Sequence, residues 1–390
     1  MNREKWINDD LAKLCSEHLD RHLQAYPACG GKILIDGRTY LNFSSNDYLG
    51  LARHPEVISA AREAASLYGA GSSASRLMTG TLPCHEELEE RISRLKGYPC
   101  ALIFGSGFLA NIGAIETLAG RNDHVFADKL IHSSLMHGIV MSRARLYRFK
   151  HNDPESLLTL LKKAPDNGRR LVITESVFSM DGDIAPLLEI AQIATDHNAM
   201  LMIDEAHATG IFGPAGSGLA KKLGIERSVT VSMSTLSKTL GSYGGVLTCR
   251  EPLKDLLISR AHSFIYSTAL PPSAAAAGSA ALKLIEKNPD MGAKLLKRSE
   301  FFRDELSKAG LNTGNSQSQI IPVIVGTSKK ALLLSEKLRE EGILSVAIRP
   351  PTVPKGSARL RFSITLDHSM EDLKSASEII VRETAAEQRT

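Results

Sequence analysis

The chain has 390 residues, enough for one large domain and a smaller one, each with its own core. Hydrophobic residues make up 43% and charged residues 23%, which favours a globular protein over a disordered or fibrous one. The net charge is only +4 and the lysines and arginines form no block, so neither a nucleic-acid partner nor an anionic membrane surface is indicated.

Cysteine usage and apolar segments narrow the class of protein further. The cysteines lie far apart with no CxxC spacing, which argues against a disulfide framework and a zinc site, and we predict no bound metal. The stretch MNREKWINDD has no apolar core of the signal-peptide type, and the tract 273–284 is too short to span a bilayer. We therefore expect a cytoplasmic protein with no membrane association.

The first third of the chain combines helical patterns with polar loops. A predicted helix over 1–28 carries Arg21 and has one apolar face, and a hairpin follows at 32–43 with an Asp-Gly turn. In SSNDYLGL (44–51), Asn46 can offer its amide to a ligand or cap the next helix. Helices are predicted at 54–68 and 83–96, and the loop between them, GAGSSASRLMTG, suits the lining of a cleft.

The segment GSGFLAN (105–111) follows a predicted strand and opens a helix. Exposed amides and the helix dipole make such a turn a site for anions. Gly105, Gly107 and Ala110 match GxGxxA, and Asp128 lies where a ribose-binding acid would follow. A dinucleotide-binding unit is therefore one alternative for this region.

Strands and helices then alternate, which predicts a mostly parallel, doubly wound sheet. The strands are predicted at 124–127, 145–149, 171–175, 200–204, 229–233 and 245–249. Ligands bind at the carboxyl ends of strands in such sheets. Polar pairs follow four of these ends: Asp128 and His132, Glu175 and Ser179, Asp204 and His207, Thr235 and Lys238.

The C-terminal part has its own βαβ-like pattern. Helices are predicted at 290–309, 328–341 and 369–384, and strands at 319–325, 343–348 and 358–364. We predict an N-terminal segment over 1–44, a large cofactor-binding domain over 45–287 and a small α+β domain over 288–390.

Two segments carry the predicted chemistry. DEAH (204–207) suggests a helicase, but the chain has no GxxxxGK[ST] to bind phosphates. In TLSKTLGSYGG (235–245), Lys238 leaves a buried strand for a small-residue loop; it is either a solvated turn lysine or an amine that attacks a carbonyl. Together with three other groups, this lysine would suit pyridoxal phosphate. Asp204 could hold the pyridine nitrogen, His132 could cover the ring face, and residues 105–108 with Thr235 could bind the phosphate.

These motifs resemble the α-oxoamine synthases, pyridoxal-phosphate enzymes of the aspartate-aminotransferase fold (fold type I). The resemblance rests on TLSKTLGSYGG, DEAHATG, TESVFSMDGDIAPL (174–187), SGF, DKLIHSSL (128–135) and RLRFSIT (359–365), and it covers nearly the whole chain. The stretch AIRPPTVPKGSARLRFSIT (347–365) is similar to that of members that join L-alanine to a pimeloyl thioester, carried by coenzyme A or an acyl carrier protein.

The resemblance implies a role for each matching residue. Lys238 would bind the cofactor aldehyde and move protons, His132 would stack on the ring, Asp204 would hold the pyridine nitrogen, and Ser179 and His207 would contact the phenolic oxygen. Further cofactor contacts are implied for Gly107, Phe108, Thr235 and, from the partner chain of a homodimer, Thr268. Asn46 and Arg361 would bind the amino acid's carboxylate, and Arg21 and Thr352 the acyl substrate.

Three alternatives stay open. The first is another family member, such as a glycine acyltransferase that forms 2-amino-3-oxobutyrate. The second is a nucleotide-binding dehydrogenase built on the 105–110 turn, which would leave Lys238, Asp204 and His132 without a role. The third is a protein that binds the cofactor without turning over a substrate.

Overall fold

The computed structural model describes residues 3–27 and 30–388. Its internal contacts define two compact units. The large unit contains Asn46–Ser179 and Asp183–Leu296, and the small unit contains Met1–Ser45, Met180–Gly182 and Lys297–Thr390. Residues 1–44, predicted as a separate segment, thus fall in the small unit.

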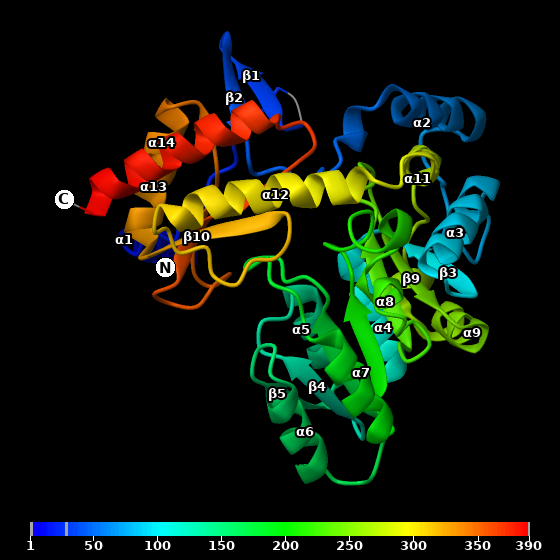
Figure 1. Cartoon of the computed structure of the whole chain (residues 1–390). Helices are drawn as coiled ribbons and strands as arrows, with labels where there is room; N and C mark the ends of the chain where they lie inside the picture. The colour runs from blue at the N-terminus through cyan, green and yellow to red at the C-terminus, as the bar shows by residue number, and fades with distance from the viewer. Residues whose placement is uncertain (1–2, 28–29, 389–390) are drawn as a thin grey trace. The chain divides into compact units, whose positions relative to one another are not determined.

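The large unit is built on a seven-stranded sheet in the order β3-β9-β8-β7-β6-β4-β5, of which Figure 1 labels β3, β9, β4 and β5. Its strands are β3 (Cys100–Phe104), β4 (His124–Asp128), β5 (Arg145–Phe149), β6 (Arg170–Glu175), β7 (Met200–Asp204), β8 (Val231–Thr235) and β9 (Gly245–Cys249). Strands β4 to β8 pair in parallel, whereas β9 is antiparallel to both β3 and β8. The predicted mostly parallel, doubly wound sheet is therefore confirmed.

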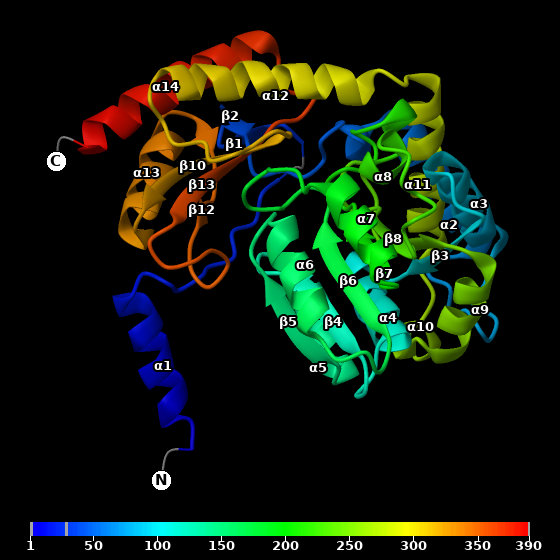
Figure 2. The same ribbon diagram turned by 60° about the horizontal axis from the view of Figure 1, so that its bottom comes forward.

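Helices cover both faces of this sheet, so its central strands are buried on both sides and read as continuous apolar runs. Figure 2 shows α6 and α7 in front of the sheet and α4 behind it. The helices are α2 (Pro55–Tyr68), α3 (Pro83–Lys96), α4 (Gly107–Leu118), α5 (Ser133–Ser142), α6 (Pro154–Lys163), α7 (Leu187–Asp196), α8 (Leu219–Lys222), α9 (Glu251–Arg260), α10 (His262–Ile265) and α11 (Pro272–Lys287), with short 3₁₀ turns η1 (Leu51–Arg53) and η2 (Pro214–Gly216). Proline begins α2, α3, α6 and α11, where its missing N–H costs no hydrogen bond.

The small unit contains two three-stranded sheets. One has the order β1-β2-β11 and the other β10-β13-β12. The strands are β1 (Lys32–Ile35), β2 (Arg38–Asn42), β10 (Ile320–Gly326), β11 (Ile343–Leu344), β12 (Ala347–Ile348) and β13 (Ala358–Ser363). The helices are α1 (Lys5–Ser16), α13 (Ser328–Glu340), α14 (Met370–Gln388) and most of α12 (Met291–Lys308). The buried ring of Phe43 forms part of its core, 5.3 Å from the Phe302 centroid and 4.4 Å from that of His368.

Two predicted elements differ from the structure. The helix over 1–28, whose positions 1, 2 and 28 lie outside the described residues, spans only Lys5–Ser16. It ends because His18 takes a left-handed φ of 57° and the N–H of Leu19 bonds back to Leu14 O at 2.8 Å, closing the last turn. The strand over 343–348 is split: β11 pairs in parallel with β2, and β12 pairs antiparallel with β13, because Ser345 and Val346 pass from one sheet to the other.

Candidate functional site

A cavity of about 180 Å³ lies in the large unit where the parallel strands end. Most of the predicted cofactor residues line it together with side chains that the sequence did not single out. Its lining consists of Ser106, Gly107, Phe108, Asn111, His132, Ser134, Glu175, Asp204, Ala206, His207, Met233, Thr235, Ser237 and Lys238. We call it the strand-end pocket.

Lys238 stands on the loop that joins β8 to β9. The loop is closed at its base by the bond from Leu236 N to Gly244 O, 2.9 Å, and at its tip by the bond from Gly241 N to Lys238 O, 2.9 Å. Gly241 has a φ of +58°, and a Cβ there would lie 2.3 Å from Ala52 N, so only glycine lets the loop pack this closely. A short, fixed loop thus presents the lysine at the pocket.

Asp204 ends β7 and its carboxylate is oriented by two donors. The side-chain amide of Asn111 donates to Oδ2 at 2.9 Å, and the N–H of Ala206 donates to Oδ1 at 2.9 Å. The residue is only 5% exposed. A carboxylate fixed in this way can hold a protonated ring nitrogen, because its charge is little screened by water.

His132 caps the N-terminus of α5, and its Nδ1 accepts from the N–H of Ser134 at 3.2 Å. Burial lowers the pKa of the imidazole; the charge of Asp204 opposes this effect and that of Lys238 adds to it. The ring is therefore neutral at pH 7. A neutral imidazole can lie on the face of a cationic aromatic ring without repulsion between charges.

Glu175 ends β6 and lines the same pocket. Its Oε1 accepts from the backbone N–H of His132 at 2.5 Å. Burial, followed by the nearby charge of Asp204, raises the pKa of the Glu175 carboxyl well above its ordinary value. This direction of the Glu175 pKa follows from its burial beside Asp204, which strand-end position could not predict.

His207 follows β7 and is held by a residue far away in the sequence. The hydroxyl of Tyr48, which is fully buried, lies 2.7 Å from His207 Nδ1 and donates to Asn46 Oδ1 at 3.1 Å. The structure thereby brings together two predicted site residues, Asn46 and His207, through a tyrosine that had no predicted role.

The N-terminus of α4 supplies the predicted anion cradle. Ser106 caps this helix of 12 residues by accepting from Leu109 N, and the amides of its first turn open toward the pocket. A Cβ at Gly245 would lie 2.4 Å from Ser106 O, so glycine is required where β9 passes the cradle. On β8, Thr235 Oγ1 lies 2.7 Å from Ser237 Oγ, which places two hydroxyls beside the same pocket.

The other predicted residues lie elsewhere in the two units. Ser179 is on the loop after β6, and Thr268 forms an isolated antiparallel bridge with Ser75. In the small unit, Arg361 is a buried residue of β13, and Arg21 Nη2 lies 3.5 Å from Thr352 Oγ1. The structure thus brings the two predicted acyl-binding residues together.

Asp128, the acid of the dinucleotide alternative, is already fully engaged. It is completely buried, its Oδ1 accepts from Leu130 N at 2.8 Å and lies 3.0 Å from His151 Nδ1, and its Oδ2 accepts from Asn152 N at 2.8 Å. The second ring nitrogen of His151 lies 2.7 Å from Asp183 Oδ2. A carboxylate with these partners has a structural role and is not placed to bind a ribose.

The stability of the protein should depend on pH through His151. Burial lowers its pKa, but the hydrogen bonds to Asp128 and Asp183 outweigh burial and raise the pKa from 6.5 to about 10. Because the folded pKa exceeds the unfolded one, this stabilisation is complete below pH 6.5 and is lost as the pH rises toward 10. Between pH 6.5 and 10 the free energy of unfolding of the wild type should fall by on the order of 2 kcal/mol through this group. In His151→Gln we expect this fall to be absent.

Urea titrations of the wild type and His151→Gln at a series of pH values measure this effect. His197→Gln is the matched control, because the imidazole that bonds Asp128 and Asp183 belongs to His151. Parallel pH profiles for the wild type and His151→Gln would contradict the assignment.

Glu205, which follows Asp204 in the sequence, forms a buried ion pair with Lys96. Glu205 accepts from Lys96 Nζ at 2.6 Å, from Leu219 N at 2.6 Å, from Ala220 N at 3.0 Å and from Ser232 Oγ at 3.0 Å. Both side chains of the pair are completely buried. These bonds tie the loop after β7 to α3, α8 and β8.

Two structural features are absent from residues 3–27 and 30–388. No group of three or more histidine, cysteine, aspartate or glutamate side chains there is arranged to hold a metal ion. No helix in that part of the chain is long and apolar enough to cross a membrane.

The donor set of the strand-end pocket fits pyridoxal phosphate. One cavity is lined by four groups that this cofactor needs. They are an amine that can form an imine, a buried carboxylate for the pyridine nitrogen, a neutral imidazole for the ring face and a helix N-terminus for the phosphate. Each of these four chemical requirements is met by a different element of the large unit.

Comparison with known proteins agrees with this fit. The family model described as aminotransferase class I and II matches residues 38–380. The chain is 43% identical over 375 residues to the 8-amino-7-oxononanoate synthase of Citrifermentans bemidjiense, covering 95% of this chain and 96% of that protein.

Solved structures are similar over most of the chain as well. The serine palmitoyltransferase of Sphingomonas wittichii has a TM-score of 0.92 at 31% identity, with 98% of this chain and 97% of that one covered. The 8-amino-7-oxononanoate synthase of Francisella tularensis has a TM-score of 0.77 at 31% identity, with 90% and 99% covered.

Proposed function

The chain belongs to the aminotransferase class I and II family, and we propose that it catalyses the decarboxylative condensation of L-alanine with a pimeloyl thioester. The products are 8-amino-7-oxononanoate, carbon dioxide and the thiol, in a step of biotin biosynthesis. The observation that supports this most directly is the single pocket that holds Lys238, Asp204 and His132.

The cofactor is pyridoxal 5'-phosphate, as expected from the sequence. When bound, it withdraws electrons from the α-carbon of the amino acid. We assign its phosphate to the amides of Gly107 and Phe108 and the hydroxyl of Thr235, and its ring to His132 and Asp204. The side chains of Ser179 and His207 are assigned to its phenolic oxygen.

The protein's own groups position the substrate and move protons. Lys238 carries the cofactor, and its amine then removes and returns the proton at the alanine Cα. Asp204 holds a positive charge on the ring nitrogen, which favours the charge that develops at Cα. Asn46 and Arg361 bind the alanine carboxylate, with the guanidinium of Arg361 suited to a bidentate pair.

The acyl substrate is assigned to Arg21 and Thr352, whose side chains lie 3.5 Å apart. A guanidinium there can bind the distal carboxylate of a pimeloyl chain. The active form is a homodimer, in which the partner subunit's Thr268 contacts the cofactor. The thiol carrier is either coenzyme A or an acyl carrier protein, because the roles assigned to Arg21 and Thr352 concern the acyl chain and not its carrier.

The test is a substrate comparison with the purified holoenzyme. Alanine with pimeloyl thioester should give carbon dioxide and thiol in equal amounts, whereas glycine with acetyl thioester should be a poor pair. The pimeloyl group is supplied once on coenzyme A and once on an acyl carrier protein. A preference for glycine and acetyl thioester would assign the chain to a different α-oxoamine synthase reaction.

The cofactor lysine can be tested separately. Borohydride reduction of the purified protein should remove its visible absorbance and leave a stable adduct on Lys238, since a reduced imine no longer exchanges. Peptide mass mapping locates the adduct, and Lys238→Ala should give none. Lys222, on α8, is the control lysine; an adduct there or at any other lysine would refute the assignment.

A further inference from the structure

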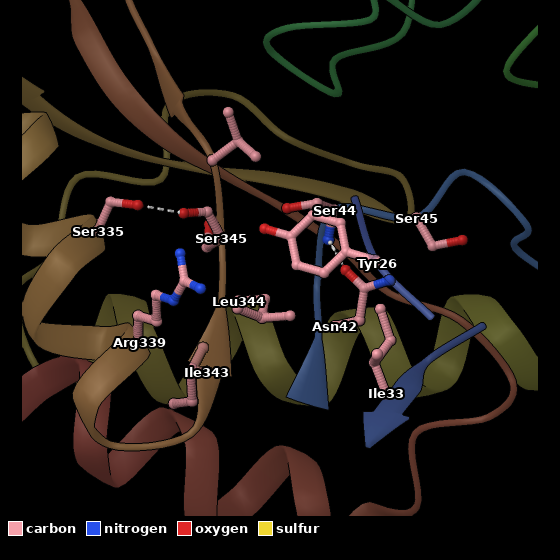
Figure 3. Close-up of a pocket in the computed structure, with 11 residues that line it drawn as sticks. Tyr26, Ile33, Asn42, Ser44, Ser45, Ser335, Arg339, Ile343, Leu344 and Ser345 are labelled. Atoms are coloured by element: carbon pink, nitrogen blue, oxygen red, sulfur yellow. Dashed lines mark hydrogen bonds between the residues drawn. The ribbon is translucent and has the colours of Figure 1, made fainter. Parts of the chain in front are cut away.

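The small unit contains a second cavity, of about 390 Å³, to which the proposed reaction assigns no role. Figure 3 shows its lining: Arg339 reaches in from α13 on one side, Tyr26, Asn42 and Ser44 lie on the other, and Leu344 and Ile343 lie between and below. Its remaining lining residues are Ile33, Ser45, Ser335, Ser345 and Val346. We call it the small-unit pocket; its volume is that of a site for a small molecule.

The charged end of the small-unit pocket is the guanidinium of Arg339. Within residues 3–27 and 30–388, no carboxylate lies within ion-pair distance of this side chain. Its Nη1 donates to the amide oxygen of Gln24 at 2.8 Å, and the hydroxyl of Tyr26 donates to the same oxygen at 3.3 Å. A neutral oxygen thus occupies a position that suits a carboxylate, for which bonds from a guanidinium are shorter and stronger.

The opposite end of the pocket has a polar atom without a partner. Ser44 Oγ is buried, and no hydrogen-bonding atom of the described chain satisfies it. Its backbone N–H already donates to Asn42 Oδ1 at 3.0 Å, and Asn42 Nδ2 donates to Gly30 O at 2.8 Å, so the neighbouring amide is engaged. A buried hydroxyl left unsatisfied is costly unless a ligand or water completes it.

The body of the pocket between these ends is apolar. Ile33, Ile343 and Leu344 are buried residues of β1 and β11, and the exposed ring of Tyr26 borders the opening. An aliphatic chain would bury its surface here with little polar cost. The ring of Tyr26 would lose exposed area when the pocket is filled.

We propose that the small-unit pocket binds a medium-chain aliphatic carboxylate, with its anionic end at Arg339 and its chain between Tyr26 and Leu344. The carboxylate takes the donors of Arg339 and Tyr26 that now bond Gln24 Oε1, so it links Tyr26 to α13 in place of the Arg339–Gln24 bond. The hydroxyl of Ser44, at the far end of the pocket, is left to a water molecule. The binding holds the segment 20–26 against the small unit. Ligand occupancy therefore stabilises a segment that has no helix or strand of its own.

The experiment is calorimetric titration of the holoenzyme with octanoate and with octanamide, its uncharged counterpart, in the absence of substrates. We expect binding of octanoate with a preference of about tenfold or more over octanamide, because a hydrogen bond to a charged group is the stronger kind. Arg339→Gln should abolish that preference, and Arg339→Lys should restore part of it. Lys337→Gln, on the same helix but outside the pocket lining, should bind octanoate like the wild type.

A second readout locates the ligand. Octanoate should slow amide hydrogen exchange in residues 20–26 of the wild type but not of Arg339→Gln. Arg21→Gln distinguishes this pocket from the proposed acyl site: octanoate binding that is lost in Arg21→Gln and kept in Arg339→Gln would overturn the proposal. No binding, or equal binding of octanoate and octanamide, would overturn it too. These binding results do not test the reaction proposed above, because the experiment measures no turnover.

Discussion

Asp204→Asn is expected to lower kcat/KM for the alanine condensation on the order of 10²–10³-fold. An asparagine keeps the shape of the side chain, and its oxygen can still accept from Ala206 N, which donates to Asp204 Oδ1 at 2.9 Å. What it loses is the negative charge that keeps the ring nitrogen protonated. The change therefore weakens the electron-withdrawing power of the cofactor, and it also places a donor nitrogen where Oδ2 now accepts from Asn111 Nδ2 at 2.9 Å.

Steady-state kinetics and a cofactor titration measure the two effects separately. The loss should appear mainly in kcat, with cofactor binding weakened less, because the substitution leaves the proposed phosphate contacts at α4 and Thr235 in place. Asp166→Asn is the matched control, since its carboxylate is 98% exposed. Near-complete retention of turnover in Asp204→Asn would show that another group controls the charge on the ring.

Lys96→Met is expected to decrease the free energy of unfolding by about 3–5 kcal/mol, the usual cost of removing one partner from a buried ion pair. The change leaves the carboxylate of Glu205 completely buried with only neutral donors, from Leu219, Ala220 and Ser232. The double variant Lys96→Met with Glu205→Gln should recover part of the loss, because no charge then stays behind.

Urea titration of the wild type, the two single variants Lys96→Met and Glu205→Gln, and the double variant gives this comparison. Lys254→Met is the control, since its pair with Glu89 at 3.3 Å is partly exposed and worth about 1 kcal/mol or less. If Lys96→Met unfolds at the same urea concentration as the wild type, Glu205 does not depend on Lys96. If the double variant is as unstable as the two single changes added together, the two residues are not coupled.

The regular elements of the large unit could be predicted because burial imposes a visible pattern on them. Strands β4, β6 and β7 read as continuous apolar runs, and four helices start at a proline. Less local features escaped prediction. The helix over 1–28 was predicted from an apolar face, but none of the residues of α1 is buried. The apolar periodicity there therefore did not mark a face that packs against the rest of the described chain. The strand over 343–348 was split because its two halves pair with strands that are distant in the sequence.

The residue types of the candidate site were predictable for a chemical reason. A cofactor that needs an amine, an acid and an anion cradle restricts them, and parallel strands bring their ends to one edge of the sheet. From the sequence by itself, Lys238, Asp204, His132 and Gly107 could be predicted to lie together, and all four line the strand-end pocket.

Only the tertiary structure decided which groups surround them. Asn111 contacts Asp204 from 93 positions away, Tyr48 contacts His207 from 159 positions away, and Glu175 meets the backbone of His132 across 43. No spacing rule connects such pairs, because they form where separate elements pack. The pKa shifts follow from the same packing: burial is the largest cause that raises the pKa of Glu175 and lowers that of His132.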